Sequence, residues 1–148
     1  MSFSFYGVLT DPPNAVSLND IEERLRQRIA RDPIVCELVR VRRSETDESP
    51  YIRLIFRRND RGDHGEWSAY IWLQRGQHIQ QQNAAQVDHA TNRCLSPEAV
   101  RNSDVRVRVL LSDDPGNEFT NPAIELLDFL GKLPGSIVFD PVQNEFVE

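Results

Sequence analysis

The chain has 148 residues, a length typical of one domain, and its 39% hydrophobic and 27% charged content is that of a globular protein, not of a membrane or disordered one. Its net charge of -6 argues against a general affinity for DNA, RNA or anionic lipid. The length predicts a single domain over residues 1–148. The first residues lack the basic and continuous apolar regions of a signal peptide, so we expect the protein to stay in the cytoplasm.

The N-terminal part of the chain predicts a short strand followed by a helix. Residues 3–8 show the alternation that is typical of a strand. Ser17 and Asp20 have the spacing of a helix capping box, and the residues after them carry an apolar stripe with a helical period. We therefore expect a helix over residues 18–31.

Three strands are predicted next, at residues 34–43, 51–58 and 67–74. Each is rich in β-branched and aromatic residues, and polar connections separate them, which favours an antiparallel meander. Alternate side chains of the middle strand are expected to face opposite sides of the sheet. The two sets are Ile52, Leu54 and Phe56 on one side and Tyr51, Arg53, Ile55 and Arg57 on the other.

The second half of the chain predicts two further helices and several strands. The expected elements are a weak strand through Ile79, a loop over 80–92, a short helix opened by Ser96, a strand over 105–111, a main helix over 121–133, a strand over 137–139 and a last strand around Phe146. The segment from Val105 to Phe139 has the element order of a βαβ crossover.

This order predicts an α+β fold with a mixed, largely antiparallel sheet of five to seven strands and two main helices packed on one of its faces. An amphipathic helix needs an apolar surface to cover, and the alternating strands supply one. The residues expected in the core include Leu25, Phe56, Val107 and Leu127.

The sequence contains none of the motifs that predict a catalytic, nucleotide or metal site. It has no glycine-rich phosphate loop and no nucleophile elbow. Cys36 and Cys94 are far apart and have no metal-ligand spacing, so we expect two reduced thiols, at least one buried, and no metal or cofactor. The neighbours Asp63–His64 and Asp88–His89 lie in polar segments, where solvated side chains are common. We therefore expect a protein that is not an enzyme.

Negative charge is concentrated in the C-terminal quarter. Residues 111–148 carry eight acidic residues against Lys132, a net charge of -7, while residues 1–110 carry +1. Such a surface keeps a protein soluble, and it can also steer a partner with a basic surface. The candidate partner-binding residues are Asp113, Asp114, Glu118, Glu125 and Asp128.

A second candidate site combines arginines with aromatic residues. If the predicted strands pair as expected, one sheet face carries Arg40, Arg42, Arg53, Arg57, Arg106 and Arg108 together with Tyr51 and with either Tyr70 or Trp72. Such a surface can bind phosphates and stack bases, and the candidate ligand-binding residues are Arg53, Arg57, Arg106 and Arg108. The alternative is a solvated face on which arginine stems cover apolar surface and pair with Glu37 or other acids.

The C-terminal sequence EFTNPAIELLDFLGKLPGSIVFDPVQNEFV resembles the helix, strand and Asp-Pro hairpin that close several small bacterial proteins, some of them similar to immunity proteins of toxin-delivery systems. The resemblance covers about 30 residues and carries no functional residue. It implies a cytoplasmic inhibitor that binds and neutralises a cognate toxin. The alternative hypothesis is a module that binds RNA, a nucleotide or another phosphate ligand on the arginine and aromatic face.

Overall fold

The computed structural model describes residues 2–10, 16–30, 36–44, 50–58, 66–114, 116 and 119–147, without the side chains of residues 30, 36, 37, 39 and 58. The elements are β1 (Phe3–Leu9), α1 (Leu18–Ala30), β2 (Cys36–Ser44), β3 (Tyr51–Arg58), β4 (Trp67–Arg75), α2 (Gln77–His89), α3 (Pro97–Asn102), β5 (Val105–Leu111), α4 (Thr120–Lys132), β6 (Ser136–Asp140) and β7 (Glu145–Val147). No helix in these ranges is long and apolar enough to cross a membrane.

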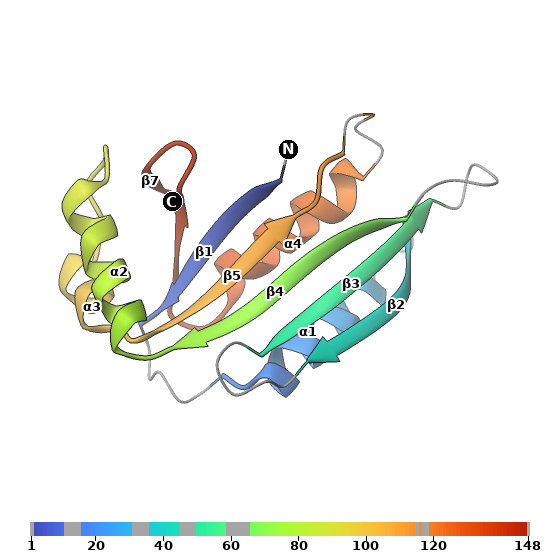
Figure 1. The fold of residues 1–148 in the computed structure, drawn as a ribbon, viewed down its shortest axis with the longest axis horizontal. Coiled ribbons are helices and arrows are strands. Elements are labelled where there is room, and N and C mark those ends of the chain that lie inside the picture. The colour runs from blue at the N-terminus through green and yellow to red at the C-terminus, as the bar shows by residue number, and fades with distance from the viewer. Residues whose placement is uncertain are drawn as a thin grey trace.

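In the described part of the chain, seven strands form one sheet in the order β2-β3-β4-β5-β1-β6-β7, and every neighbouring pair is antiparallel (Figure 1). The α+β class and the predicted meander of β2, β3 and β4 are confirmed. β1 lies between β5 and β6, so these two strands run parallel without pairing. The predicted βαβ unit is therefore split by the N-terminal strand.

One face of the sheet is covered by α1 and α4, as predicted for the two main helices (Figure 1). Leu25, Phe56 and Val107 are buried in the core beneath these helices, which confirms their predicted positions. Leu127 is only partly buried, in contrast to its prediction. It lies on the side of α4 that borders an open groove.

The helix α4 approaches β1 very closely at Gly7. A Cβ atom at this position would lie 2.6 Å from Leu130 Cδ1 and 2.8 Å from Ser136 Oγ. Both distances are too short for a contact with a carbon atom, so a side chain at position 7 would force Leu130 and Ser136 to shift.

The prediction for residues 77–89 is wrong, because the segment forms α2 instead of a weak strand and the first part of a loop, while residues 90–92 lie outside any helix or strand, as predicted. Gln and Ala are good helix formers, but the buried side of the helix is not continuously apolar. Ile79 and Asn83 are both buried on α2, and the Asn83 side chain donates to the Ser103 carbonyl at 2.9 Å. A polar residue on the inner side interrupts the stripe by which a helix is recognised.

The helices α2 and α3 cover only one end of the second face of the sheet (Figure 1). Beneath them lies a smaller core that joins α3 to the strands β1, β6 and β7, with Val8, Cys94, Val100, Phe139 and Phe146. The middle of β3, β4 and β5 carries no helix on this side (Figure 1). We call this uncovered part the open face, and its side chains include Arg42, Arg53, Tyr70, Trp72 and Arg108.

The predicted capping box of α1 is present. The Asp20 amide donates to Ser17 Oγ at 3.1 Å, and the Ser17 amide donates to Asp20 Oδ2 at 3.0 Å. The expected cost of Ser17→Ala is about 1 kcal/mol of unfolding free energy, measured by urea denaturation at neutral pH. The exposed Glu23→Ala is the control and should change the stability by less than about 0.5 kcal/mol. Equal losses in both variants would contradict a specific cap.

Candidate functional site

Among the acidic candidates of the loop after β5, Asp114 contributes to the structure of the chain. Asp114 Oδ2 accepts a hydrogen bond from the Phe119 amide at 2.8 Å, just before α4 begins. Asp113 is exposed in the same loop, and Glu118 lies outside the described residues. Asp114 is thus engaged in ordering the start of a helix.

The two acidic candidates of α4 bind an arginine of α1. Arg28 Nε donates to Glu125 Oε2 at 2.7 Å, and the same guanidinium pairs with Asp128. Lys132 Nζ lies 3.0 Å from Asp128 Oδ2, and its hydrogen bond, together with that from Arg28, lowers the pKa of Asp128. These carboxylates join α1 to α4 on the face opposite the open face, and basic residues already pair with both of them.

The predicted arginine and aromatic residues do share one face of the sheet. The pairing places Arg42 opposite Arg53 and Arg53 opposite Tyr70, and it places Tyr51 and Arg108 on either side of Trp72. Directly paired residues of a sheet point to the same side. The described side chains of this face include the arginines 40, 42, 53, 57, 106 and 108 against one carboxylate, Glu66.

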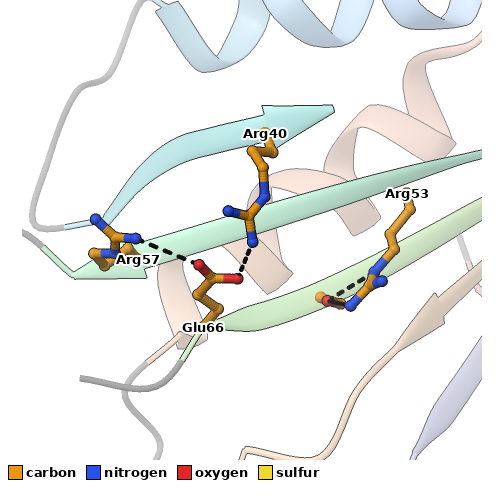
Figure 2. Close-up of polar contacts among 5 residues, drawn as sticks. Arg40, Arg53, Arg57 and Glu66 are labelled. Carbon is orange, nitrogen blue, oxygen red and sulfur yellow. Dashed lines mark hydrogen bonds and ion pairs between the residues drawn. The ribbon is translucent and has the colours of Figure 1, made fainter. Parts of the chain in front are cut away.

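Glu66 neutralises the arginines at one border of the open face. Figure 2 shows Arg40 and Arg57 converging on its carboxylate, and Arg57 Nη2 lies 3.3 Å from Glu66 Oε1. The side chain of Glu37, the acid named in the sequence as a pairing candidate, lies outside the described residues. Within the described part of the chain, Arg57 is therefore the member of the predicted ligand set that has an ion-pair partner.

Arg53 has no acidic partner among the described residues. Its Nε and Nη2 donate to the Ser68 hydroxyl at 3.2 and 3.0 Å, and its Cζ lies 5.5 Å from the centre of the Tyr70 ring. Figure 2 shows it apart from the Glu66 cluster. Its exposed neighbour Arg42 also has no carboxylate partner within the described residues.

Arg108 repeats this arrangement two strands away. Its Nε and Nη2 donate to the Ser4 hydroxyl at 3.2 and 3.0 Å, and its Cζ lies 5.0 Å from the centre of the Trp72 ring. Each guanidinium therefore uses the same pair of nitrogens on a neutral oxygen and rests on an aromatic ring. A hydroxyl does not neutralise the positive charge, so both charges remain available to a ligand.

An aromatic cluster separates these two arginines. The rings of Tyr70 and Trp72 stack with centres 5.5 Å apart at an angle of 15°. Tyr51 lies across them, with centre distances of 6.2 Å to Tyr70 and 6.0 Å to Trp72. All three residues are partly exposed. The open face thus presents apolar ring surface between two cations that no described carboxylate neutralises.

Arg106 is buried at the border between the open face and α2. It is 5% exposed, its Cζ lies 4.2 Å from the Tyr6 ring centre, and it donates to the side-chain oxygens of Gln74 at 2.6 Å and Gln82 at 2.5 Å. Desolvation lowers the pKa of Arg106, and the nearby charge of Arg108 adds to this effect. Its donors serve the contact between α2 and the sheet, so it is the least accessible of the predicted ligand residues.

We expect Arg106→Met to stay within about 1 kcal/mol of the wild-type stability and Arg106→Ala to lose about 1–3 kcal/mol. Methionine fills the same space without the cost of burying a charge, whereas alanine leaves a cavity beside Tyr6. Urea unfolding of the two variants measures the difference. Equal destabilisation by both would show that the hydrogen bonds to the glutamines dominate.

Sequence reasoning missed the residues that position these arginines. Ser4 and Ser68 are ordinary strand residues, and only the strand register reveals them as acceptors. Gln82 belongs to the segment wrongly predicted as a loop. Arg28 lies on α1, 97 positions from Glu125 of α4, so no local sequence pattern predicts that the two residues pair.

The remaining candidates for a catalytic or metal site are the two cysteines and the two Asp–His neighbours. Cys94 is buried in the smaller core, which confirms one buried thiol, and the side chain of Cys36 lies outside the described residues. Asp88 pairs with Arg101 at 2.8 Å, and Asp63–His64 also lie outside them. Among the described residues, no three His, Cys, Asp or Glu side chains are grouped as a metal site.

A groove of about 760 Å³ lies between α4 and the outer strands β6 and β7. Its lining includes Ile124, Leu127 and Val147. The charged residues at its rim, Asp128 and Lys132, pair with each other at 3.0 Å. The groove therefore offers a ligand apolar contact and little free charge.

The open face is the described surface with the clearest binding chemistry. It can hold negative groups on Arg42, Arg53 and Arg108 and apolar groups on Tyr51 and Trp72. Comparisons with protein-family models, with curated proteins and with solved structures find no match to this chain.

Proposed function

We propose that this protein is a non-enzymatic, cytoplasmic binding protein whose open face binds a partner that carries negative charge. One observation supports the proposal above all others. In a protein of net charge -6, Arg53 and Arg108 are fixed on aromatic rings and serines, with no carboxylate partner among the described residues.

The alternative of a solvated, self-neutralised face accounts for only part of this surface. Arg40 and Arg57 do pair with Glu66, as surface arginines commonly do. Arg53 and Arg108 instead rest on rings that remain partly exposed. Trp, Tyr and Arg are the residues most enriched among those that dominate binding energy in protein interfaces. This composition favours a binding surface.

The most specific form of the proposal is an immunity-type inhibitor that neutralises a cognate bacterial toxin. It is supported by the C-terminal resemblance and by an interface-like surface. A captured partner would have to be toxic when expressed alone, and co-expression of this protein would have to restore growth. Restored growth with an open-face variant would assign the protection to another surface.

Capture of partners from the cell that produces the protein tests the proposal. The immobilised wild type is compared with Arg53→Gln/Arg108→Gln and with Arg26→Gln/Arg101→Gln, which removes the same charge from arginines that pair with acids elsewhere. We expect a partner that the wild type and the control retain and that the open-face variant loses. Equal retention by all three proteins would contradict the proposal.

The expectation of a basic partner at the acidic C-terminal quarter is tested in the same experiment. Asp113→Lys is the variant used, with its unfolding measured beside the wild type, because Asp113 is exposed, whereas Asp114 accepts a backbone hydrogen bond and Glu125 and Asp128 pair with Arg28. Loss of the partner from this variant alone would place the binding surface at the loop after β5. Retention by Asp113→Lys, with loss from the open-face variant, supports the open face.

A further inference from the structure

We infer that the partner on the open face is a protein segment that presents carboxylates to Arg53 and Arg108. The inference rests on the proposed function and narrows it to one chemical class of partner. It follows from which guanidinium nitrogens are occupied, from what lies on the aromatic rings, and from the charge of the whole chain.

Each of the two guanidinium groups keeps one edge for a ligand. In both, Nε and Nη2 bind a serine hydroxyl, and Nη1 has no hydrogen-bond partner within the described residues. The edge formed by Nη1 and Nη2 can donate two parallel hydrogen bonds. That geometry matches the two oxygens of a carboxylate.

These edges are fixed before a ligand arrives. Ser68 and Ser4 each bind two nitrogens of one guanidinium, and the rings of Tyr70 and Trp72 support its plane. A side chain that is already ordered loses little entropy on binding. The arginines therefore act as two prepared anchor points, with the exposed Arg42 adding charge beside Arg53.

The aromatic rings are poorly arranged for nucleic acid. Stacking of a base requires a free ring face. Trp72 stacks on one face of the Tyr70 ring. Arg53 of β3 also lies over this ring, and its hydrogen bonds to Ser68, which is on β4 like Tyr70, hold it there. Trp72 carries Arg108. A base that stacks on Tyr70 or Trp72 would therefore have to displace a ring or a guanidinium from its contacts.

The charge of the chain points in the same direction. Nucleic-acid affinity comes largely from many phosphate contacts, which a basic surface must supply together. Here the net charge is -6, and two of the six arginines on the face are already paired with Glu66. The binding of a few carboxylates at Arg53 and Arg108 does not require such an extended basic surface.

The test uses a fluorescein-labelled oligo-glutamate peptide and a single-stranded RNA of equal charge, titrated separately against the purified protein. The variants are Arg53→Gln/Arg108→Gln, Arg53→Lys/Arg108→Lys, and the control Arg26→Gln/Arg101→Gln. In Trp67→Phe, Trp72 is the only tryptophan, so its emission reports the open face. Titrations are compared at ~10 mM and ~150 mM salt, where the screening length falls from about 30 to about 8 Å.

We expect the peptide to bind more tightly than the RNA and to change the emission of Trp72. The glutamine variant should lose about tenfold or more in peptide affinity. The lysine variant keeps the charge but not the paired donors, so it should also weaken binding, while the control stays within about twofold. Circular dichroism and thermal unfolding test whether each variant is folded. If the glutamine variant does not fold, the lysine variant gives the second readout.

Tighter RNA binding that the same variants abolish would overturn the inference and leave the proposed binding face in place. Peptide binding that the control weakens as much as the glutamine variant would also overturn it, since net charge alone would then explain it. Absence of peptide binding, with a captured cell partner still lost from the open-face variant, would reject the carboxylate class but not the proposed function.

Discussion

Replacing Phe56 by alanine is expected to lower the free energy of unfolding by about 3–5 kcal/mol. Phe56 is 2% exposed, and its ring packs against Trp67 at a centre distance of 5.8 Å. Trp67 in turn stacks on Phe119 at 5.6 Å and an angle of 7°. The truncation thus removes one end of an aromatic row that joins β3 and β4 to the residue before α4.

Leu127→Ala is the matched control for this effect, since it removes a side chain of α4 that lines an open groove. It should cost no more than about 1.5 kcal/mol, because much of the space left behind is open to water. Urea unfolding of Phe56→Ala, Leu25→Ala and Leu127→Ala gives the comparison. A loss at Leu127 as large as that at Phe56 would contradict the placement of the core.

The contact of α4 with β1 predicts an energetic coupling between Gly7 and Leu130. Gly7→Ala should cost about 1–3 kcal/mol, because its Cβ would lie 2.6 Å from Leu130 Cδ1 in a closely packed region. Leu130→Ala should cost about 2–5 kcal/mol by leaving a cavity. In the double variant the new methyl group of residue 7 occupies part of that cavity, so the combined loss should be smaller than the sum.

A double-mutant cycle by chemical denaturation measures this coupling directly. Ile21→Ala combined with Gly7→Ala is the control, because Ile21 is equally buried but lies on α1. We expect additive losses in that control. Additive losses in the Gly7 and Leu130 pair would show that α4 moves away from β1 to accept a side chain.

The elements that were correctly predicted are those specified by neighbouring residues. Ser17 and Asp20 lie within one helical turn, and the alternation in β3 fixes which of its side chains face the core. The arginine and aromatic residues of the open face could be grouped for the same reason. Strand alternation places them on one side as soon as the strands pair.

The features that were missed depend on partners far away in the sequence. Asn83 is tolerated inside α2 because the Ser103 carbonyl accepts its hydrogen bond. The acidic residues of α4 look like a free surface until Arg28 of α1 is placed beside them. The place of β1 between β5 and β6 and the binding of Arg108 to Ser4 likewise appear only in the assembled sheet.

The central place of β1 also has a consequence for the order in which the chain folds. Ser4 is 104 positions from its partner Arg108, and Thr10 is 125 positions from Gly135. Closing such long loops is slow, whereas the meander of β2, β3 and β4 forms from contacts that are close in the chain. During synthesis, β1 therefore stays unpaired until β5, the first of its two neighbours in the chain, has emerged. We expect this apolar strand to be the segment that a holding chaperone protects, and its insertion to be a late step in folding.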